Sequence, residues 1–391
     1  MDSIAGKKSG LTWAVHISVA ALVLLWIFPT LGLFVSSFRT GDQITASGWW
    51  KALFPSEQNE QFRAADPEDN REMIDGVYVV AGNVYVEAGK VDDPADVAAD
   101  VSAWGVSSRE ISAYAPGDTA DLGEGETMTV QANGDYVWSG SDEQISGRAP
   151  RIFVTALSPP DFTLQNYDTV LFDPANREGM TKAFFNTLTV TIPATIIPIL
   201  IAAFAAYALA WMDFPGRALL IAAVVGLLVV PLQLALIPLL KIHNDIGIGK
   251  GYLGVWLAHT GFGLPLAIYL LRNYMVGLPK DIIENAKVDG ATDFQIFTKI
   301  ILPLSFPALA SFAIFQFLWT WNDLLVAMVF LIDSSGETTV MTRQIVELLG
   351  TRGGDWEILA TSAFVSIAVP LGVFFAMQKY LVRGLLAGSV K

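Results

Sequence analysis

Long runs of apolar residues with few charges dominate the pattern of the chain. A helix needs about 20 apolar residues, at ~1.5 Å rise per residue, to cross the ~30 Å hydrocarbon core of a bilayer. Lipid offers no partners to unpaired backbone groups, so such runs must form helices that pack as a bundle. The pattern therefore predicts an all-α polytopic membrane protein with six transmembrane helices. The six runs are Leu11–Phe38, Ala183–Met212, Ala218–Leu240, Tyr252–Tyr274, Leu304–Ile332 and Ile358–Leu381.

The segment between the first two runs, roughly residues 40–180, is too long and too polar to be a simple loop. VYVVAGNVYVEAG alternates apolar and polar residues around Gly82-Asn83, as β-strands do. TMTVQANGDYVWSG alternates around Asn133-Gly134, a strong signal for a hairpin with a two-residue turn. We therefore expect a small β-rich insert over residues 41–180. Residues 1–40 then hold the N-terminus and first helix, and residues 181–391 form a five-helix transmembrane domain.

Lysine and arginine are distributed unevenly between alternate loops, and this bias sets the orientation of a membrane protein. With the N-terminus inside, ten of these residues fall in inner segments and four in the short outer loops. The bias predicts a multi-pass protein of the bacterial cytoplasmic (inner) membrane with both termini in the cytoplasm. The β-rich insert is then extracytoplasmic. The first run begins too late and is too long for a typical cleaved signal peptide, so we expect it to be an anchor.

The formal net charge of −14 belongs to one segment of the chain. Between Asp42 and Asp161 there are 22 acidic and 7 basic residues, a balance of −15, so the remainder is close to neutral. Acidic character argues against a nucleic-acid partner, which requires a basic surface. The chain has no cysteine and only three histidines, none with a partner at metal-ligand spacing, so we expect no metal site.

The sequence contains no recognisable catalytic motif. Residues 249–254 match G-x-G-x-x-G, but they lie in a predicted loop between two membrane helices, without the strand that a dinucleotide site requires. A phosphate-binding P-loop, a G-x-S-x-G motif and an H-E-x-x-H motif are all missing from the sequence. We therefore expect the chain not to be an enzyme and to bind no cofactor itself.

A charged interruption, residues 279–303, separates two of the apolar runs. Pro279 suits the first turn of a helix, and Gly290 suits its C-terminal cap. Thr292 and Gln295 fit a capping box that begins a second helix almost at once. In that second helix, Phe294, Phe297, Ile300 and Ile301 are expected to line one side, and Pro303 to mark its end or its bend into the next span. An exposed apolar face on two short helices favours docking against a partner over lying flat on lipid.

The same stretch resembles the EAA loop of type I ABC importer permeases. Glu284-x-Ala286, Gly290 and Ile300-x-Leu302-Pro303 match its spacing throughout, with Asn285 where alanine is usual. FFNTLTVTIPAT, LLRNYMVGLPKDIIENAKVDGAT, WTWNDLL and GLLAGSVK resemble the maltose-type carbohydrate permeases. The similarity covers roughly residues 160–391 and the first span, and the acidic insert is most like the alpha-glucoside permease branch.

This resemblance implies the six-helix permease fold and a mechanism. Coupling helices in such a loop dock in a cleft of a cytoplasmic ATPase, whose ATP-driven closure turns the bundle from inward-facing to outward-facing. The implied partners are a second homologous permease subunit in a heterodimer, two ATPase subunits that bind ATP and Mg, an extracytoplasmic sugar-binding protein, a carbohydrate substrate and the lipid bilayer. The implied coupling residues are Glu284, Ala286, Asp289, Gly290, Phe294, Phe297, Ile300, Leu302 and Pro303.

Candidates for the translocation pathway are polar or aromatic residues within the spans. Asn322 and Asp323 lie about 28–30 Å from Pro303 along a helix at ~1.5 Å per residue. An ionisable residue in a span is a functional candidate by default, and sugars bind such groups beside aromatic rings such as Trp319. Gln233 is a further candidate. The alternative is that these residues reach outer water or contact the second permease.

Other classes of function stay open. A type I importer for a non-sugar solute would carry the same loop. A secondary transporter driven by an ion gradient would favour inverted repeats and charged midplane residues, which the runs largely lack. A membrane-anchored receptor would leave the 279–303 loop unexplained.

Overall fold

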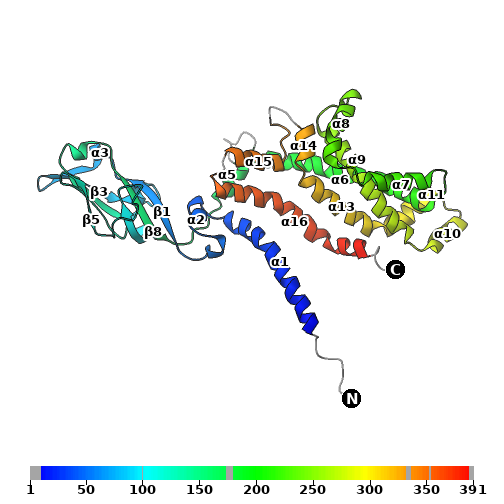
Figure 1. The fold of residues 1–391 in the computed structure, drawn as a ribbon, viewed down its shortest axis with the longest axis horizontal. Helices are drawn as coiled ribbons and strands as arrows, with labels where there is room; N and C mark the ends of the chain where they lie inside the picture. The colour runs from blue at the N-terminus through cyan, green and yellow to red at the C-terminus, as the bar shows by residue number, and fades with distance from the viewer. Residues whose placement is uncertain (1–9, 99, 173–178, 332–335, 352–353, 387–391) are drawn as a thin grey trace, which may run out of the picture. The chain divides into compact units, whose positions relative to one another are not determined.

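The computed structural model describes residues 10–98, 100–172, 179–331, 336–351 and 354–386 of the 391. These residues form two compact units. The first is Met1–Asn166 with Asp355–Ala360, and the second is Tyr167–Gly354 with Thr361–Lys391. Figure 1 shows that strands gather in the first unit and that the second is helical.

The first unit begins with the long helix α1 (Gly10–Ser36), which agrees with the first predicted span. It is long and apolar enough to cross a membrane, and most of its apolar side chains are exposed. A turn of helix, α2 (Gly41–Ala46), follows, with Thr40 as its N-cap, and then the 3-10 turn η1 (Trp49–Lys51). Helix α5 (Gln165–Phe172) follows the strands, and the Asn166 side chain donates hydrogen bonds to the carbonyls of Ser37 and Arg39.

Two antiparallel sheets make up the β unit, which we define as residues 56–158. One sheet has the order β1 (Ser56–Arg63), β8 (Arg151–Ser158), β4 (Asp100–Gly105). The other has the order β2 (Arg71–Ile74), β3 (Val77–Asn83), β7 (Asp135–Gly140), β6 (Glu126–Val130), β5 (Thr119–Gly123). Short helices α3 (Pro67–Asn70), α4 (Val84–Glu87), η2 (Pro94–Asp96) and η3 (Gln144–Ser146) connect them.

The core of the β unit is aromatic, and its two tryptophans are hydrogen-bonded. Trp104 and Trp138 are at most 1% exposed. The Trp104 indole N–H donates to the carbonyl of Ala115, and that of Trp138 donates to the Glu126 carboxylate. Burial of such large side chains is the main source of stability of a small domain. The β-rich prediction for the insert is therefore confirmed.

The hairpin predicted at Asn133-Gly134 is confirmed with a longer connection, whereas the chain does not turn at Gly82-Asn83. Gly82 and Asn83 lie at the end of β3, and Asn83 caps α4 instead of turning the chain. The turn lies before β3, at Asp75 (φ 50°) and Gly76 (φ 83°), an Asp-Gly pair of the kind that favours type I′ turns. Asn133-Gly134 does close a hairpin, in which residues 131–134 connect β6 to β7.

Most of the helices predicted to cross the membrane lie in the second unit, whereas α1 lies in the first. Within the described residues, four helices of the chain are long and apolar enough to span by themselves, and two bent pairs bring the total to six if each pair is one span. The single helices are α1, α6 (Met180–Trp211), α9 (Tyr252–Val276) and α16 (Trp356–Leu386). One bent pair is α7 (Arg217–Leu227) with α8 (Leu232–Asp245), and the other runs from residue 293 to α13 (Phe306–Trp321).

Two of the predicted continuous spans are broken. The run Ala218–Leu240 bends by 111° between α7 and α8, next to Pro231, which has no N–H to continue the helix. The run Leu304–Ile332 ends its helix at Trp321, and the chain starts again as α14 (Leu325–Phe330). Ile332 lies outside the described residues, and α15 (Met341–Thr351) comes later. Apolarity alone cannot distinguish a straight helix from two helices joined at a break.

Close packing of α6 on α9 forms the centre of this unit. The α6 face carries the small, buried residues Ala202, Ala203 and Ala206. Small side chains let two helix backbones approach closely, the usual way in which membrane helices associate. Arg217 and Arg272 both donate to the carbonyl of Leu209 near the C-terminal end of α6, where cations are favoured.

Candidate coupling loop and pathway residues

The first helix of the 279–303 loop, α10 (Lys280–Val288), ends in a Schellman motif. Gly290 has φ +81°, in the left-handed region that glycine adopts at little cost. The N–H of Ala291 donates to the Ala286 carbonyl at 3.0 Å, and that of Gly290 to Lys287 at 3.1 Å. These two bonds define the Schellman motif and satisfy carbonyls that the helix end would leave unpaired. The predicted role of Gly290 as a C-terminal cap is confirmed.

The second helix begins with the predicted capping box. The N–H of Gln295 donates to the Thr292 hydroxyl at 3.3 Å, and the Gln295 amide oxygen accepts from the Thr292 N–H at 2.9 Å. Helix α11 (Asp293–Ile296) thus starts three residues after Gly290. Two reciprocal caps in sequence fix the angle between the helices, because both ends of the short connection are hydrogen-bonded.

The side of this loop that faces α6 and α9 is part of the apolar core of the second unit. Ile283, Ala286, Ile296, Phe297 and Ile301 are buried against α6 and α9. The Phe297 ring lies 4.6 Å from the ring of Phe204 and 5.2 Å from that of Tyr207, centre to centre. The loop is therefore attached to the membrane helices through apolar and aromatic packing.

The predicted single apolar face of the second helix is wrong. Phe294 is 66% exposed, Ile300 is half-buried, and only Phe297 and Ile301 are buried. After Phe294 the chain enters a π-helical turn, η4 (Phe297–Ile301), whose wider spacing departs from the 3.6-residue period assumed for Ile300 and Ile301. Together with Val288, which is 86% exposed, Phe294 forms what we call the outer face of the loop.

Charged side chains lie on the outer part of the loop. The Glu284 carboxylate pairs with the Lys280 ammonium at 2.7 Å, one helical turn away, and this hydrogen bond raises the pKa of Lys280. Lys287 lies 3.7 Å from Asp293 and so bridges the two helices. The Tyr207 hydroxyl donates to Asp293 at 3.4 Å. Glu284, Asp289 and Gly290 are exposed, so their polar groups remain accessible.

The loop joins the next span through a sharp bend. Helix α12 (Leu302–Leu304) contains Pro303, and the chain from residue 293 to 304 makes an angle of 70° with α13. Buried Ser305 stands at the bend, and its N–H still donates to the Ile301 carbonyl at 2.8 Å. The predicted bend after Pro303 is confirmed, with Leu302 half-buried and Pro303 exposed.

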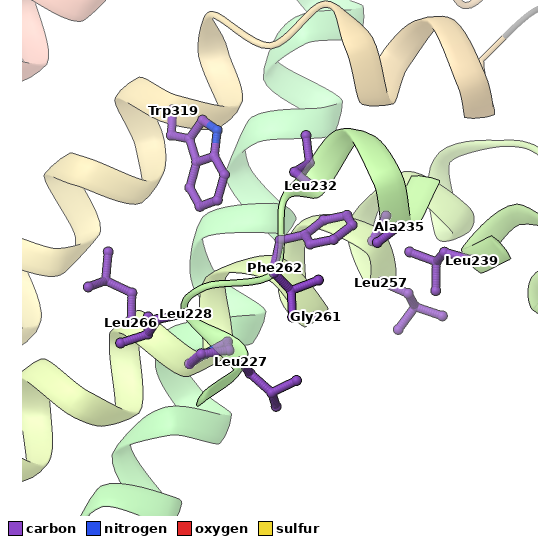
Figure 2. Close-up of a pocket in the computed structure, with 13 residues that line it drawn as sticks. Leu227, Leu228, Leu232, Ala235, Leu239, Leu257, Gly261, Phe262, Leu266 and Trp319 are labelled. Carbon is purple, nitrogen blue, oxygen red and sulfur yellow. The ribbon is translucent and has the colours of Figure 1, made fainter. Parts of the chain in front are cut away.

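Of the predicted pathway residues, Trp319 lines a cavity in the second unit. Figure 2 shows this cavity, of about 510 Å³, beside the break between α7 and α8 and against α9. Its other lining side chains are aliphatic or phenylalanine, with Pro265 and Gly261. The Trp319 indole N–H is thus the one polar side-chain group available to a ligand among the lining residues. Gln233, although close in sequence to Leu232, is exposed and does not line this cavity.

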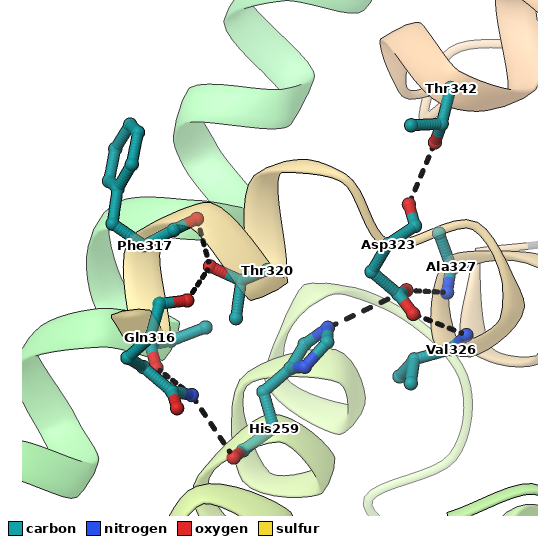
Figure 3. A network of polar contacts seen from close by, with 9 residues as sticks. His259, Gln316, Phe317, Thr320, Asp323, Val326, Ala327 and Thr342 are labelled. Atoms are coloured by element: carbon teal, nitrogen blue, oxygen red, sulfur yellow. Dashed lines mark hydrogen bonds and ion pairs between the residues drawn. The ribbon is translucent and has the colours of Figure 1, made fainter. Parts of the chain in front are cut away.

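Asn322 and Asp323 stand at the end of α13 and have structural partners. The Asn322 side chain donates to the Leu318 carbonyl at 2.9 Å. The Asp323 carboxylate accepts from the N–H groups of Val326 at 3.4 Å and Ala327 at 3.1 Å, which begin α14 (Figure 3). A carboxylate that caps a helix start explains an acidic residue here without a substrate.

Sequence analysis missed the buried polar groups that surround Asp323. His259 of α9 is 1% exposed, and its Nε2 lies 3.6 Å from the Asp323 carboxylate (Figure 3). The Gln316 amide of α13 donates to the His259 carbonyl at 3.4 Å and to that of Ala194 in α6 at 3.1 Å. These bonds connect three helices at depth. The sequence signal for these buried polar groups is that His259 and Gln316 each lie within an apolar run.

Comparison with known proteins identifies the family. A model described as a binding-protein-dependent transport system inner membrane component matches residues 182–386. The alpha-glucoside transport system permease protein AglG of Rhizobium meliloti (strain 1021) is 60% identical over 391 residues, covering 98% of this chain and 98% of that protein. The osmoprotective compounds uptake permease protein GgtD of Synechocystis sp. is 58% identical over 240 residues, covering 61% and 79%.

A solved structure of a bacterial ABC transporter involved in the import of alginate contains a chain with TM-score 0.47 and 23% identity, covering 57% of this chain and 81% of that one.

The resemblance to the alpha-glucoside branch, expected from sequence motifs, is confirmed by the likeness to AglG over nearly the whole length. With more than half of the residues matched by the family model, the chain belongs to the inner-membrane components of binding-protein-dependent transport systems.

Proposed function

We propose that this chain is the permease subunit of an ATP-binding-cassette importer that moves an alpha-glucoside or related oligosaccharide across the cytoplasmic membrane. The observation that carries the proposal is the 279–303 loop: doubly capped, packed on the membrane helices on one side and exposed on the other. The likeness to AglG, a protein named for alpha-glucoside transport, supports the choice of substrate.

In this proposal the outer face of the loop docks on a partner ATPase, which binds ATP and Mg. Phe294 and Val288 supply exposed apolar surface, and Glu284 and Asp289 are exposed beside them. Phe297, Ile301 and Ala286 transmit the motion, because they are buried against α6 and α9. A stiff connection is needed for force transmission, and the two caps around Gly290 supply it.

The pathway is proposed to be completed by a second, homologous permease in a heterodimer. The cavity at Trp319 offers too few polar groups for the many hydroxyls of a sugar, and each buried hydroxyl without a partner is costly. A six-span arrangement with both termini in the cytoplasm places the loop beside two ATPase subunits. The β unit then faces an extracytoplasmic sugar-binding protein.

A second candidate function is the import of a non-sugar solute. It is favoured by the 58% identity to GgtD, a protein named for uptake of osmoprotective compounds. That likeness covers 61% of this chain, against 98% for AglG, so the alpha-glucoside assignment accounts for more of the sequence.

Uptake of labelled maltose into vesicles that contain the reconstituted complex tests the proposal. We expect uptake to require the ATPase subunits and ATP, and Phe294→Ala to abolish the coupling of ATP hydrolysis to uptake while the chain stays folded. Ile74→Ala is the matched control, because Ile74 is 50% exposed in β2, outside the loop. Maltose uptake that persists without the ATPase refutes the proposal, and uptake of an osmolyte in place of maltose selects the second candidate.

A further inference from the structure

A second cavity, in the unit that contains the strands, has no role in the proposed coupling. Its volume is about 540 Å³, within the 300–1,000 Å³ range typical of small-molecule sites. Residues that follow α1, strand β1, helix α4 and the end of β8 all line it. Its lining is markedly polar, in contrast to the apolar cavity at Trp319.

Two polar groups at this cavity are buried without a partner. Tyr85 is 5% exposed, and its hydroxyl has no hydrogen bond. The Glu60 carboxylate uses Oε1 to pair with the Lys90 ammonium at 2.7 Å, while its buried Oε2 has no hydrogen bond. Buried polar atoms in native proteins nearly always have partners. A free donor-acceptor and a free acceptor at one cavity therefore point to a bound hydroxyl-bearing molecule.

The side chains concerned are held in place by the fold. The Tyr85 N–H donates to the Asn83 side chain at 3.0 Å, which fixes the start of α4. The Tyr85 ring packs edge-on against Phe62, with ring centres 5.2 Å apart. Lys90 lies over the same Phe62 ring at 5.5 Å. Burial, and then the charge of Glu60, raises the pKa of Tyr85, so its hydroxyl stays protonated and can donate. Such preorganisation is expected of a binding site.

The charges around the cavity restrict the class of ligand. Asp42, Glu60 and Asp161 face one cation, Lys90, so an anionic ligand is disfavoured. No group of three His, Cys, Asp or Glu side chains able to hold a metal ion occurs within the described ranges. Apolar walls, such as Pro159, can contact the C–H faces of a ring. We propose that this cavity is an accessory saccharide site, which binds a neutral sugar through Tyr85 and Glu60.

This inference rests on the proposed function only for the choice of maltose as probe. The lining residues all belong to the first unit and include none of the coupling-loop residues, so absence of sugar binding there leaves the transport assignment unchanged. Conversely, if vesicles took up another solute, binding of a neutral sugar at Tyr85 would still be measurable.

Calorimetric titration of the full-length chain in lipid nanodiscs with maltose tests the site. Tyr85→Phe and Glu60→Gln should each weaken binding roughly five- to tenfold, as expected for the loss of one hydrogen bond. Tyr78→Phe is the matched control, since Tyr78 lies in β3 and does not line the cavity. It should leave the affinity unchanged. Gluconate, an anionic sugar acid, should bind more weakly than maltose because of the acidic lining.

The fold of each variant is checked by its near-UV circular dichroism and thermal unfolding. Tyr85→Phe keeps the ring that packs on Phe62, so the native spectrum should be retained. Equal maltose affinity in wild type and Tyr85→Phe overturns the inference, and so does the absence of binding at millimolar maltose. Tighter binding of gluconate than of maltose also overturns it.

Discussion

Gly290 gives the sharpest test of the loop geometry. A Cβ added there would meet nothing within 4 Å, so a side chain acts only through the backbone at φ +81°. A non-glycine residue in the left-handed region costs about 1–2 kcal/mol. Alanine regains part of this by restricting the unfolded chain, so Gly290→Ala should destabilise the loop by about 1 kcal/mol. β-Branched Gly290→Val should cost about 1–3 kcal/mol, and Gly290→Asn the least, because asparagine tolerates this region.

Hydrogen exchange of the Gly290 and Ala291 amides measures this cost, since both donate in the Schellman motif. Exchange through local opening should be roughly fivefold faster in Gly290→Ala and up to about 150-fold faster in Gly290→Val. Coupled ATP hydrolysis in the assembled complex should fall in the same order. Gly350→Ala is the control, because that position also has open space and an ordinary helical φ. Equal exchange in the Asn, Ala and Val variants refutes the argument.

Three further outcomes are expected. Phe297→Ala, which removes a ring buried against two aromatic rings of α6, should lower the free energy of unfolding by about 3–5 kcal/mol, measured by thermal melts. A Cβ at Gly263 would stand 2.7 Å from the Gln316 Oε1, so Gly263→Ala should cost about 1–3 kcal/mol in the same melts. Gly261→Ala should not lower the stability, because an added Cβ there meets nothing within 4 Å. Equal losses of stability in the two variants contradict the idea that the Gly263 variant acts through its contact with Gln316. Burial raises the pKa of Tyr136 to about 12, above its unfolded value of 10.0. The neutral Tyr136 hydroxyl therefore contributes about 2–3 kcal/mol to the free energy of unfolding below pH ~10, and this contribution is lost as the pH rises toward 12. Denaturant unfolding followed by tryptophan fluorescence at each pH measures the loss. A free energy of unfolding that stays constant between pH ~10 and ~12 contradicts this prediction.

Features set by neighbours in sequence were predicted correctly. The cap at Gly290 and the box of Thr292 and Gln295 depend on residues within one turn, and the structure has both. The Asp75-Gly76 turn is encoded equally locally, by an Asp-Gly pair with positive φ at both residues, but it was not predicted.

Contacts between distant segments could not be predicted. Asp323 and His259 are 64 residues apart and meet only because α9 packs beside the end of α13. Phe294 and Phe297 are three residues apart and looked equivalent, yet one is exposed and the other is buried between Phe204 and Tyr207. Phe297 is buried because α6 offers a surface on which its ring packs.

The sequence alone specifies that the chain enters a bilayer, because apolar runs of this length have no other favourable environment. It also determined where the exposed loop begins and turns, because caps are local. Tertiary packing sets where the apolar runs break, at Pro231 and after Trp321, and which side chains of the loop stay exposed. Those outcomes depend on the shapes of surfaces that come together from far apart in the chain, which no local pattern specifies.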